Sequence, residues 1–171
     1  KILSSDNVNA QKSKEGLNGS CSVDEIHVVD EAFMKRISRM GISRAEPMIL
    51  QVTTAGDDPL SYGKQRYDYG MRVNSGAFEN PSFFFDWHEA PPTLTDEELK
   101  ADPIKFGKMA NPAWGHTVGE EEFIDDLRGC DTPSSLRTFK MYRLNIWQQS
   151  SNPLLQAHNW EKCRREVSWE Y

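Results

Sequence analysis

Asp24 and Glu25 are the residues of this sequence whose types and spacing point most directly to chemistry. They follow residues 20–23, a run too short for a helix, which predicts the end of a buried strand. Two carboxylates at the end of a parallel strand can divide the work of nucleotide hydrolysis. Asp24 would hold a magnesium ion through a bound water, and Glu25 would orient or deprotonate the attacking water. Ligands of open α/β sheets bind outside the carboxyl ends of the strands, which is where this pattern puts the pair.

The same two carboxylates also suit a purely structural interpretation. An acidic dipeptide after an apolar run often starts a loop or caps a helix. His27, two residues after Glu25, is expected to be a hydrogen-bonded structural residue, because no second histidine stands at metal-ligand spacing. Residues 21–27 taken alone leave both interpretations open.

A second polar segment follows the stretch "MILQVTT" at 48–54, which is predicted to be a strand because it is apolar, β-branched and bounded by turn residues. Thr53, Thr54 and Gly56 then supply hydroxyls in a tight turn. Motor ATPases need small polar side chains beside the γ-phosphate so that hydrolysis is transmitted to the rest of the machine. A plain Gly-Asp turn is the structural alternative. The two motifs in this order, joined by one crossover helix, favour a nucleotide site.

The residues between the two motifs predict a helix that is capped by Asp30 and ended by Gly41. Its apolar positions, Phe33, Ile37 and Met40, recur at four- and three-residue spacing. This helix would connect the two strands and cover one face of their sheet.

Three further elements are expected in the first half of the chain. Residues 1–4 predict a short strand, residues 59–73 a helix, and "PSFFFDWHEA" at 81–90 a third long strand. Strands alternating with helices, with connections long enough for crossovers, predict an α/β fold with a parallel sheet.

Composition changes near residue 91, after which the chain predicts helices and loops. Thr95 with Glu98, and Thr117 with Glu120, have the spacing of a capping box, so each pair is predicted to open a short acidic helix. A longer amphipathic helix is predicted to follow the proline at position 133.

Composition and charge restrict the class of protein. The formal net charge of -6 requires any nucleic-acid binding to come from a local basic face. No apolar stretch approaches the roughly 20 residues of a membrane-spanning helix. The three cysteines, Cys21, Cys130 and Cys163, are widely spaced without a C-x-x-C pair, which favours free thiols in a reducing compartment and hence the cytoplasm.

The motifs together resemble the large subunit of bacteriophage terminase, the DNA-packaging ATPase of tailed phages. "VDEIH" at 23–27 is similar to its Walker B box, and "ILQVTTAGDDP" at 49–59 is similar to its coupling motif. The similarity continues in "NPSFFFDWHEAP", "MANPAWGHTVGEEEF", "FKMYRLNIWQQS" and "NWEKCR", at 80–91, 109–123, 139–150 and 159–164. These later segments have no generic chemical meaning, so the resemblance points to this family rather than to P-loop enzymes at large.

The resemblance implies a fold and a division into two parts. Residues 1–90 would be the C-terminal part of a RecA-like P-loop ATPase domain, with part of its parallel sheet. Residues 91–171 would be a mostly helical extension and linker toward a metal-dependent nuclease domain of RNase H-like fold elsewhere in the protein.

The resemblance also implies residue roles and partners. It carries the magnesium role to Asp24, the catalytic role to Glu25, and the coupling and γ-phosphate-sensing role to Thr53, Thr54 and Gly56. ATP and Mg²⁺ would be the cofactors of the full-length protein. Its partners would be double-stranded DNA, the portal protein, the small terminase subunit and further copies of itself in a ring, in the cytoplasm of a phage-infected or prophage-carrying bacterium.

One expected motif is missing from the sequence. No G-x-x-x-x-G-K-[ST] phosphate loop occurs, because Gly63-Lys64 and Gly107-Lys108 are followed by glutamine and methionine. Without that cradle the β- and γ-phosphates lack their backbone N–H donors. The chain is therefore expected to be a fragment, from a partial gene or a decayed prophage, that binds neither ATP nor Mg²⁺ tightly and is inactive alone.

Two other classes of protein remain open. A helicase of the D-E-x-H type has a similar acidic box, but it needs a second RecA-like domain with an arginine-rich motif, whereas residues 91–171 carry helices, tryptophans and acidic caps. A non-catalytic interaction module would use the sheet as a scaffold and Arg137, Lys140 and Arg143 as its contact face.

Overall fold

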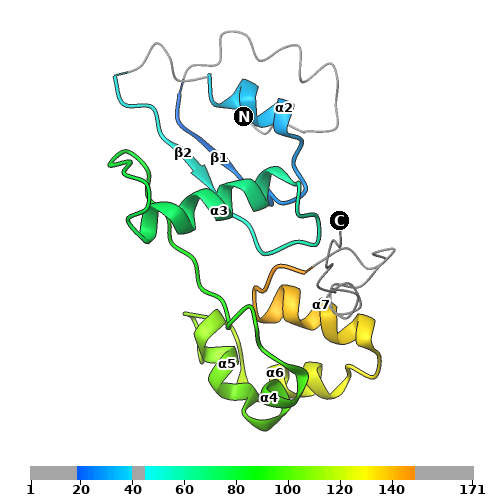
Figure 1. The fold of residues 1–171 in the computed structure, drawn as a ribbon. Coiled ribbons are helices and arrows are strands. Elements are labelled where there is room, and N and C mark those ends of the chain that lie inside the picture. The colour runs from blue at the N-terminus through cyan, green and yellow to red at the C-terminus, as the bar shows by residue number, and fades with distance from the viewer. Residues whose placement is uncertain (1–18, 40–44, 149–171) are drawn as a thin grey trace, which may run out of the picture.

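The computed structural model describes residues 19–39 and 45–148, which form a mixed α/β structure. Figure 1 shows the sheet with α2 and α3 in one part of the molecule and α4 to α7 in the other. No described helix has the length and apolarity needed to cross a bilayer. In chain order the elements are β1 (Cys21–Val23), α2 (Glu31–Ile37), β2 (Ile49–Gln51), α3 (Tyr62–Asn74), α4 (Asp96–Ala101), α5 (Pro103–Ala110), α6 (Glu120–Arg128) and α7 (Pro133–Arg143).

Strands β1 and β2 pair in parallel, as the sequence predicts, with Val23 opposite Gln51. The connection between them contains α2, so it is a crossover of the expected kind. Beyond the strands, the Val52 N–H donates to the Val23 carbonyl at 3.0 Å, and the Ile26 N–H donates to the Val52 carbonyl at 3.4 Å. The two chain segments therefore stay side by side past the last paired residues.

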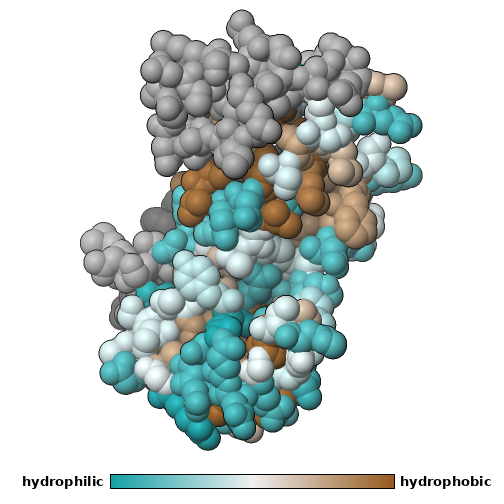
Figure 2. Space-filling view, turned by 180° about the vertical axis from the view of Figure 1, so that it is seen from behind, coloured by the Kyte–Doolittle hydropathy of each residue, from teal (hydrophilic) through white to brown (hydrophobic). Residues whose placement is uncertain are grey.

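The two faces of this sheet differ in burial. On one face, Cys21 and Val23 pack against the buried side chains of α2, as Tyr62 also does. On the other face Leu50 is 50% exposed, and Met48 and Val52 are exposed in the same alternation. The view of Figure 2 likewise shows hydrophobic side chains at the surface of the sheet-bearing part and a mainly hydrophilic surface over the helical part. The prediction of a buried strand at 20–23 is wrong in this respect, because β1 is covered on one face only.

Helix α2 begins as predicted and ends earlier. The Asp30 carboxylate caps it by accepting a hydrogen bond from the Ala32 N–H. Its C-cap is Ser38. The Ser38 N–H donates to the Met34 carbonyl at 2.9 Å, and the Ser38 hydroxyl donates to the Lys35 carbonyl. The apolar helix position expected at Met40, the stop expected at Gly41 and the strand expected at 1–4 lie outside the described residues.

The third strand predicted at 81–90 is wrong. The alternation behind the prediction is present, because Phe83, Phe85 and Trp87 point to one side and Phe84 to the other, where it is 87% exposed. The three rings stack at centroid distances of 6.4 and 6.2 Å. Phe85 and Trp87 meet Tyr67 of α3 edge to face, and Phe83 meets Tyr69 of the same helix in this way. This segment packs its rings on a helix and forms no β-ladder with β1 or β2. Among the described residues, the sheet therefore has two strands.

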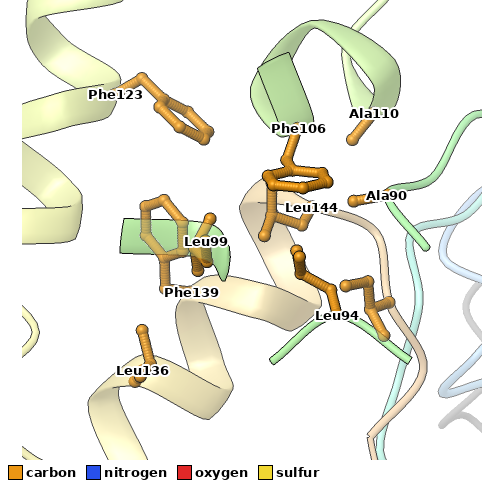
Figure 3. Close-up of a cluster of buried hydrophobic side chains, with 10 residues drawn as sticks. Ala90, Leu94, Leu99, Phe106, Ala110, Phe123, Leu136, Phe139 and Leu144 are labelled. Carbon is orange, nitrogen blue, oxygen red and sulfur yellow. The ribbon is translucent and has the colours of Figure 1, made fainter. Parts of the chain in front are cut away.

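The four helices after position 91 enclose a separate apolar core. Figure 3 shows this core, in which Phe123 is fully buried and meets the rings of Trp114 and Phe139 edge to face at 5.1 Å. Aromatic contacts of this geometry add stabilisation beyond the area that they bury. The buried members of the core are Ala90, Leu94, Leu99, Phe106, Ala110, Phe123, Leu136, Phe139, Leu144 and Ile146.

One of the two capping boxes predicted for these helices is present and the other is not. Thr95 and Glu98 form the expected capping box at the start of α4. The box expected from Thr117 and Glu120 is wrong, because α6 starts directly after Gly119 and has no side-chain cap. The short turn before α6 explains this: the Thr117 N–H donates to a carbonyl four residues earlier, which keeps Thr117 inside that turn. Helix α5 was not predicted, although its N-cap aspartate followed by proline is a start signal.

Two of the three cations proposed for the face of an interaction module, Lys140 and Arg143, are paired within the chain, whereas no such pairing involves Arg137 among the described residues. Lys140 donates to the Leu94 carbonyl at 2.9 Å and pairs with Asp96 at 2.6 Å. Arg143 pairs with Glu122 at 2.6 Å and with Asp126, and both carboxylates raise its pKa. These two cations hold the helical core together, so they do not form an open contact surface.

Candidate functional site

Parallel pairing brings the two sequence motifs to one edge of the sheet. We call residues 24–28 the acidic turn and residues 53–56 the threonine turn. The first follows the carboxyl end of β1 and the second follows that of β2. Because carboxyl ends of parallel strands share an edge, the register of β1 and β2 alone makes the two turns neighbours.

The acidic turn holds its carboxylates at the surface. Glu25 has φ 53°, a left-handed conformation that non-glycine residues seldom adopt, and its N–H donates to Asp24 Oδ1 at 2.9 Å. The Val28 N–H closes the turn on the Glu25 carbonyl at 3.1 Å, and Ile26 anchors it as a buried side chain. Asp24 and Glu25 therefore project from a fixed backbone into solvent, where a ligand can reach them.

His27 joins the acidic turn to the threonine turn. Its backbone N–H donates to Thr53 Oγ1 at 3.2 Å, and its ring Nδ1 lies 2.8 Å from the same oxygen. The same Nδ1 lies 3.1 Å from Glu25 Oε2. The expectation that His27 is a hydrogen-bonded structural residue is confirmed, and through it the structure links Glu25 to Thr53.

Thr54 and Gly56 lie further from the carboxylates. The Thr54 carbonyl accepts the Thr53 hydroxyl at 2.9 Å, which shapes the turn from inside. Gly56 is buried, and a Cβ there would come within 3.2 Å of the His27 ring and 3.3 Å of that of Trp147. Thr53 is thus the residue of the threonine turn that is linked to Glu25, because both contact Nδ1 of His27. Gly56 allows the turn to pack closely against His27.

Asn145 fastens the threonine turn and was not predicted as a site residue. Its Oδ1 accepts the Ala55 N–H at 2.7 Å, and its Nδ2 donates to the His88 carbonyl at 2.8 Å. Three residues later the Gln148 N–H donates to the Gly56 carbonyl at 3.0 Å. Asn145 has φ 54°, and asparagine tolerates this conformation better than most residues. Neither its residue type nor its spacing from other polar residues indicates this role in the sequence.

The first turn of α3 packs against the acidic turn. Gly63 lies in its first turn, and an ideal Cβ there would come 2.7 Å from Cα and 2.9 Å from N of His27. Both atoms belong to the backbone, which cannot rotate away as a side chain can. The missing side chain at position 63 therefore lets α3 approach the acidic turn.

We expect Gly63→Ala to lower the free energy of unfolding by about 1–3 kcal/mol, the usual cost of overpacking. The sign of this change in stability tests the close packing, because alanine stabilises a helix by about 1 kcal/mol relative to glycine where there is room for its side chain. Chemical denaturation followed by circular dichroism measures the change. Gly19→Ala is the comparison variant, because among the described residues no atom beyond its chain neighbours lies within 4 Å of a Cβ at that position. A Gly63→Ala protein as stable as the control would mean that α3 does not press on His27.

The site suits a magnesium ion that arrives with phosphate, and not a cage built from protein ligands alone. Within residues 19–39 and 45–148, no group of three His, Cys, Asp or Glu side chains is placed to hold a metal. Mg²⁺ commonly keeps several waters and uses one or two carboxylates together with substrate phosphates. Asp24, exposed and next to Glu25, fits that role, and the bound ion would supply neutralisation of phosphate charge.

Comparisons of the chain with models of protein families, with curated proteins and with solved structures give no match. The residues of the acidic turn and the threonine turn, with their contacts and their motifs, therefore carry the functional assignment.

Proposed function

We propose that this chain is part of an ATP-hydrolysing motor of the terminase large-subunit type, which packages double-stranded DNA into phage proheads. The observation that carries the proposal is the contact of His27 with both Thr53 and Glu25, at 2.8 and 3.1 Å. A motor needs a link between the group that activates water and the strand that responds to the γ-phosphate. The acidic turn and the threonine turn are linked in this manner across two parallel strands.

A RecA-like sheet, of which β1 and β2 would be two neighbouring strands, is part of the proposal. Sheets of parallel strands are normally covered on both faces, because their crossovers place helices there. The exposed face with Met48, Leu50 and Val52 is consistent with a sheet that is completed by other parts of the protein. Residues 91–148 would then be the helical extension toward a nuclease domain.

Each site residue receives one role in this proposal. Asp24 would hold the magnesium ion through a bound water, and Glu25 would orient or deprotonate the attacking water. Thr53 senses the γ-phosphate, while Thr54 and Gly56 keep the threonine turn in the shape that this needs. Exposure of both carboxylates and the fixed backbone under them support the assignment.

The further terms of the proposal come from the resemblance of the motifs. The partners are double-stranded DNA, a portal protein, a small terminase subunit and other copies of the chain in a ring. The setting is the cytoplasm of a phage-infected or prophage-carrying bacterium. The phosphate loop, absent from the sequence, would be supplied by residues outside these 171.

Two measurements test the proposal. The DNA that flanks the coding region should encode a Walker A loop upstream and an acidic nuclease cluster downstream. The 171-residue chain alone should hydrolyse ATP no faster than a control without protein, because it has no cradle for the phosphates. Unrelated genes on both sides would contradict the assignment, and turnover by the isolated chain would contradict the need for the missing loop.

A further inference from the structure

The position of His27 is defined on several sides. Its side chain is only 12% exposed, and the two close glycines, Gly56 and Gly63, border its ring and its backbone. Its Nδ1 has two oxygen neighbours, Thr53 Oγ1 at 2.8 Å and Glu25 Oε2 at 3.1 Å. In each contact the proton can lie on Nδ1 or on the oxygen, and the neighbouring hydrogen bonds decide which.

The threonine hydroxyl settles the direction of the first contact. A hydroxyl has one proton to donate, and its oxygen can accept others. Thr53 Oγ1 lies 2.9 Å from the Thr54 carbonyl, which can only accept, so the hydroxyl proton points there. The His27 N–H, at 3.2 Å, can only donate to the same oxygen. The remaining contact, from Nδ1 at 2.8 Å, must therefore be donated by the ring.

The carboxylate leads to the same result. Ionised Glu25 has only acceptor oxygens, and Oε2 faces the same ring nitrogen. Both neighbours of Nδ1 thus need a proton on it. Free neutral histidine in water prefers to carry its proton on Nε2, so this environment reverses the usual preference.

We propose that His27 is a positioning residue whose neutral ring carries its proton on Nδ1, and that this N–H bridges the Thr53 hydroxyl and the Glu25 carboxylate. The tautomer follows from the contacts alone. Its consequence for hydrolysis rests on the function proposed above: a shift of the threonine turn that removes the hydroxyl changes what Nδ1 can bond, and so changes the hold on Glu25.

The tautomer can be measured directly in the full 171-residue chain. Long-range ¹H–¹⁵N correlation spectra of ¹⁵N-labelled protein, at a pH where the ring is neutral, distinguish a protonated from an unprotonated ring nitrogen. We expect Nδ1 of His27 to be the protonated nitrogen. His88 is an internal reference of the opposite kind, since its Nε2 lies 3.3 Å from Asp86 Oδ1. A neutral His27 with its proton mainly on Nε2 would overturn the proposal.

Variants of the two acceptors separate a bridge from simple burial. Thr53→Ser retains a hydroxyl and should retain the Nδ1–H form. Thr53→Val combined with Glu25→Ala removes both acceptors and should move the population toward Nε2–H. A double variant with unchanged tautomer would show that neither side chain holds the proton on Nδ1. If instead the ATPase proposal fails, this spectrum still decides the bridge, because it involves no nucleotide.

Discussion

In the full-length ATP-hydrolysing protein that we propose, Glu25→Gln is expected to lower kcat by about 10²–10⁴-fold, the usual contribution of a general base. Binding of ATP should remain close to that of the unmodified protein. The amide has nearly the shape of the carboxylate, and its oxygen can still accept from Nδ1 of His27, which lies 3.1 Å from the carboxylate now. It has lost the ability to take a proton from water. Steady-state hydrolysis and titration with a fluorescent nucleotide measure the two quantities separately.

Glu31→Gln is the matched control for that experiment. Glu31 is also an exposed glutamate, in the first turn of α2, where it pairs with Lys35 at 2.8 Å. Loss of such a surface pair changes stability by less than about 1 kcal/mol and should leave turnover unchanged. Undiminished hydrolysis by Glu25→Gln would remove Glu25 from the mechanism, and an equal loss in both variants would point to a general effect of charge.

Phe123→Ala is expected to lower the free energy of unfolding of the helical core by about 3–5 kcal/mol. The side chain is fully buried, and its ring fills the space between Trp114, Phe139 and the close helix position Gly107. Truncation removes buried apolar area, takes away the edge-to-face partner of Trp114 and Phe139, and leaves a cavity between their rings. A loss of this size is comparable with the whole stability of many small domains, about 5–15 kcal/mol.

Phe84→Ala deletes the same chemical group from a position that is 87% exposed. Its effect should stay within about 0.5 kcal/mol, as for most surface substitutions. Urea denaturation of both variants, followed by far-ultraviolet circular dichroism, makes the comparison. Equal losses in the two variants would contradict the placement of Phe123 at the centre of the core.

Local patterns predicted the elements that depend on neighbours in sequence. The Asp30 cap, the capping box of Thr95 and Glu98, and the parallel pairing of β1 with β2 are all present. Each depends on a short stretch of chain: a side chain that reaches an N–H two or three residues away, or a crossover long enough for one helix. The predicted third strand failed because alternation indicates an extended backbone but does not say what lies beside it.

The contacts within the site could be predicted only in part. The order of the two motifs indicated that Glu25 and the threonines would share a sheet edge, and the structure adds that Thr53 reaches Glu25 through His27. The role of Asn145 could not be derived, since nothing in its neighbourhood indicates a partner ninety positions earlier in the chain. Tertiary contacts between side chain and backbone leave no periodic trace in a sequence.

That long-range bond has a consequence for the order in which the molecule folds. Ala55 and Asn145 are separated by 90 positions, and closing a loop costs more entropy as it lengthens, about 0.6 kcal/mol for each doubling. The contacts among α4, α5, α6 and α7 join neighbours in sequence and can form first. The threonine turn, which can meet His27 early, is expected to acquire its bonds to residues 145–148 late. During synthesis on the ribosome, the acidic turn and the crossover after it are made early. The site can be completed only after residues 145–148 have been made, 90 positions after Ala55.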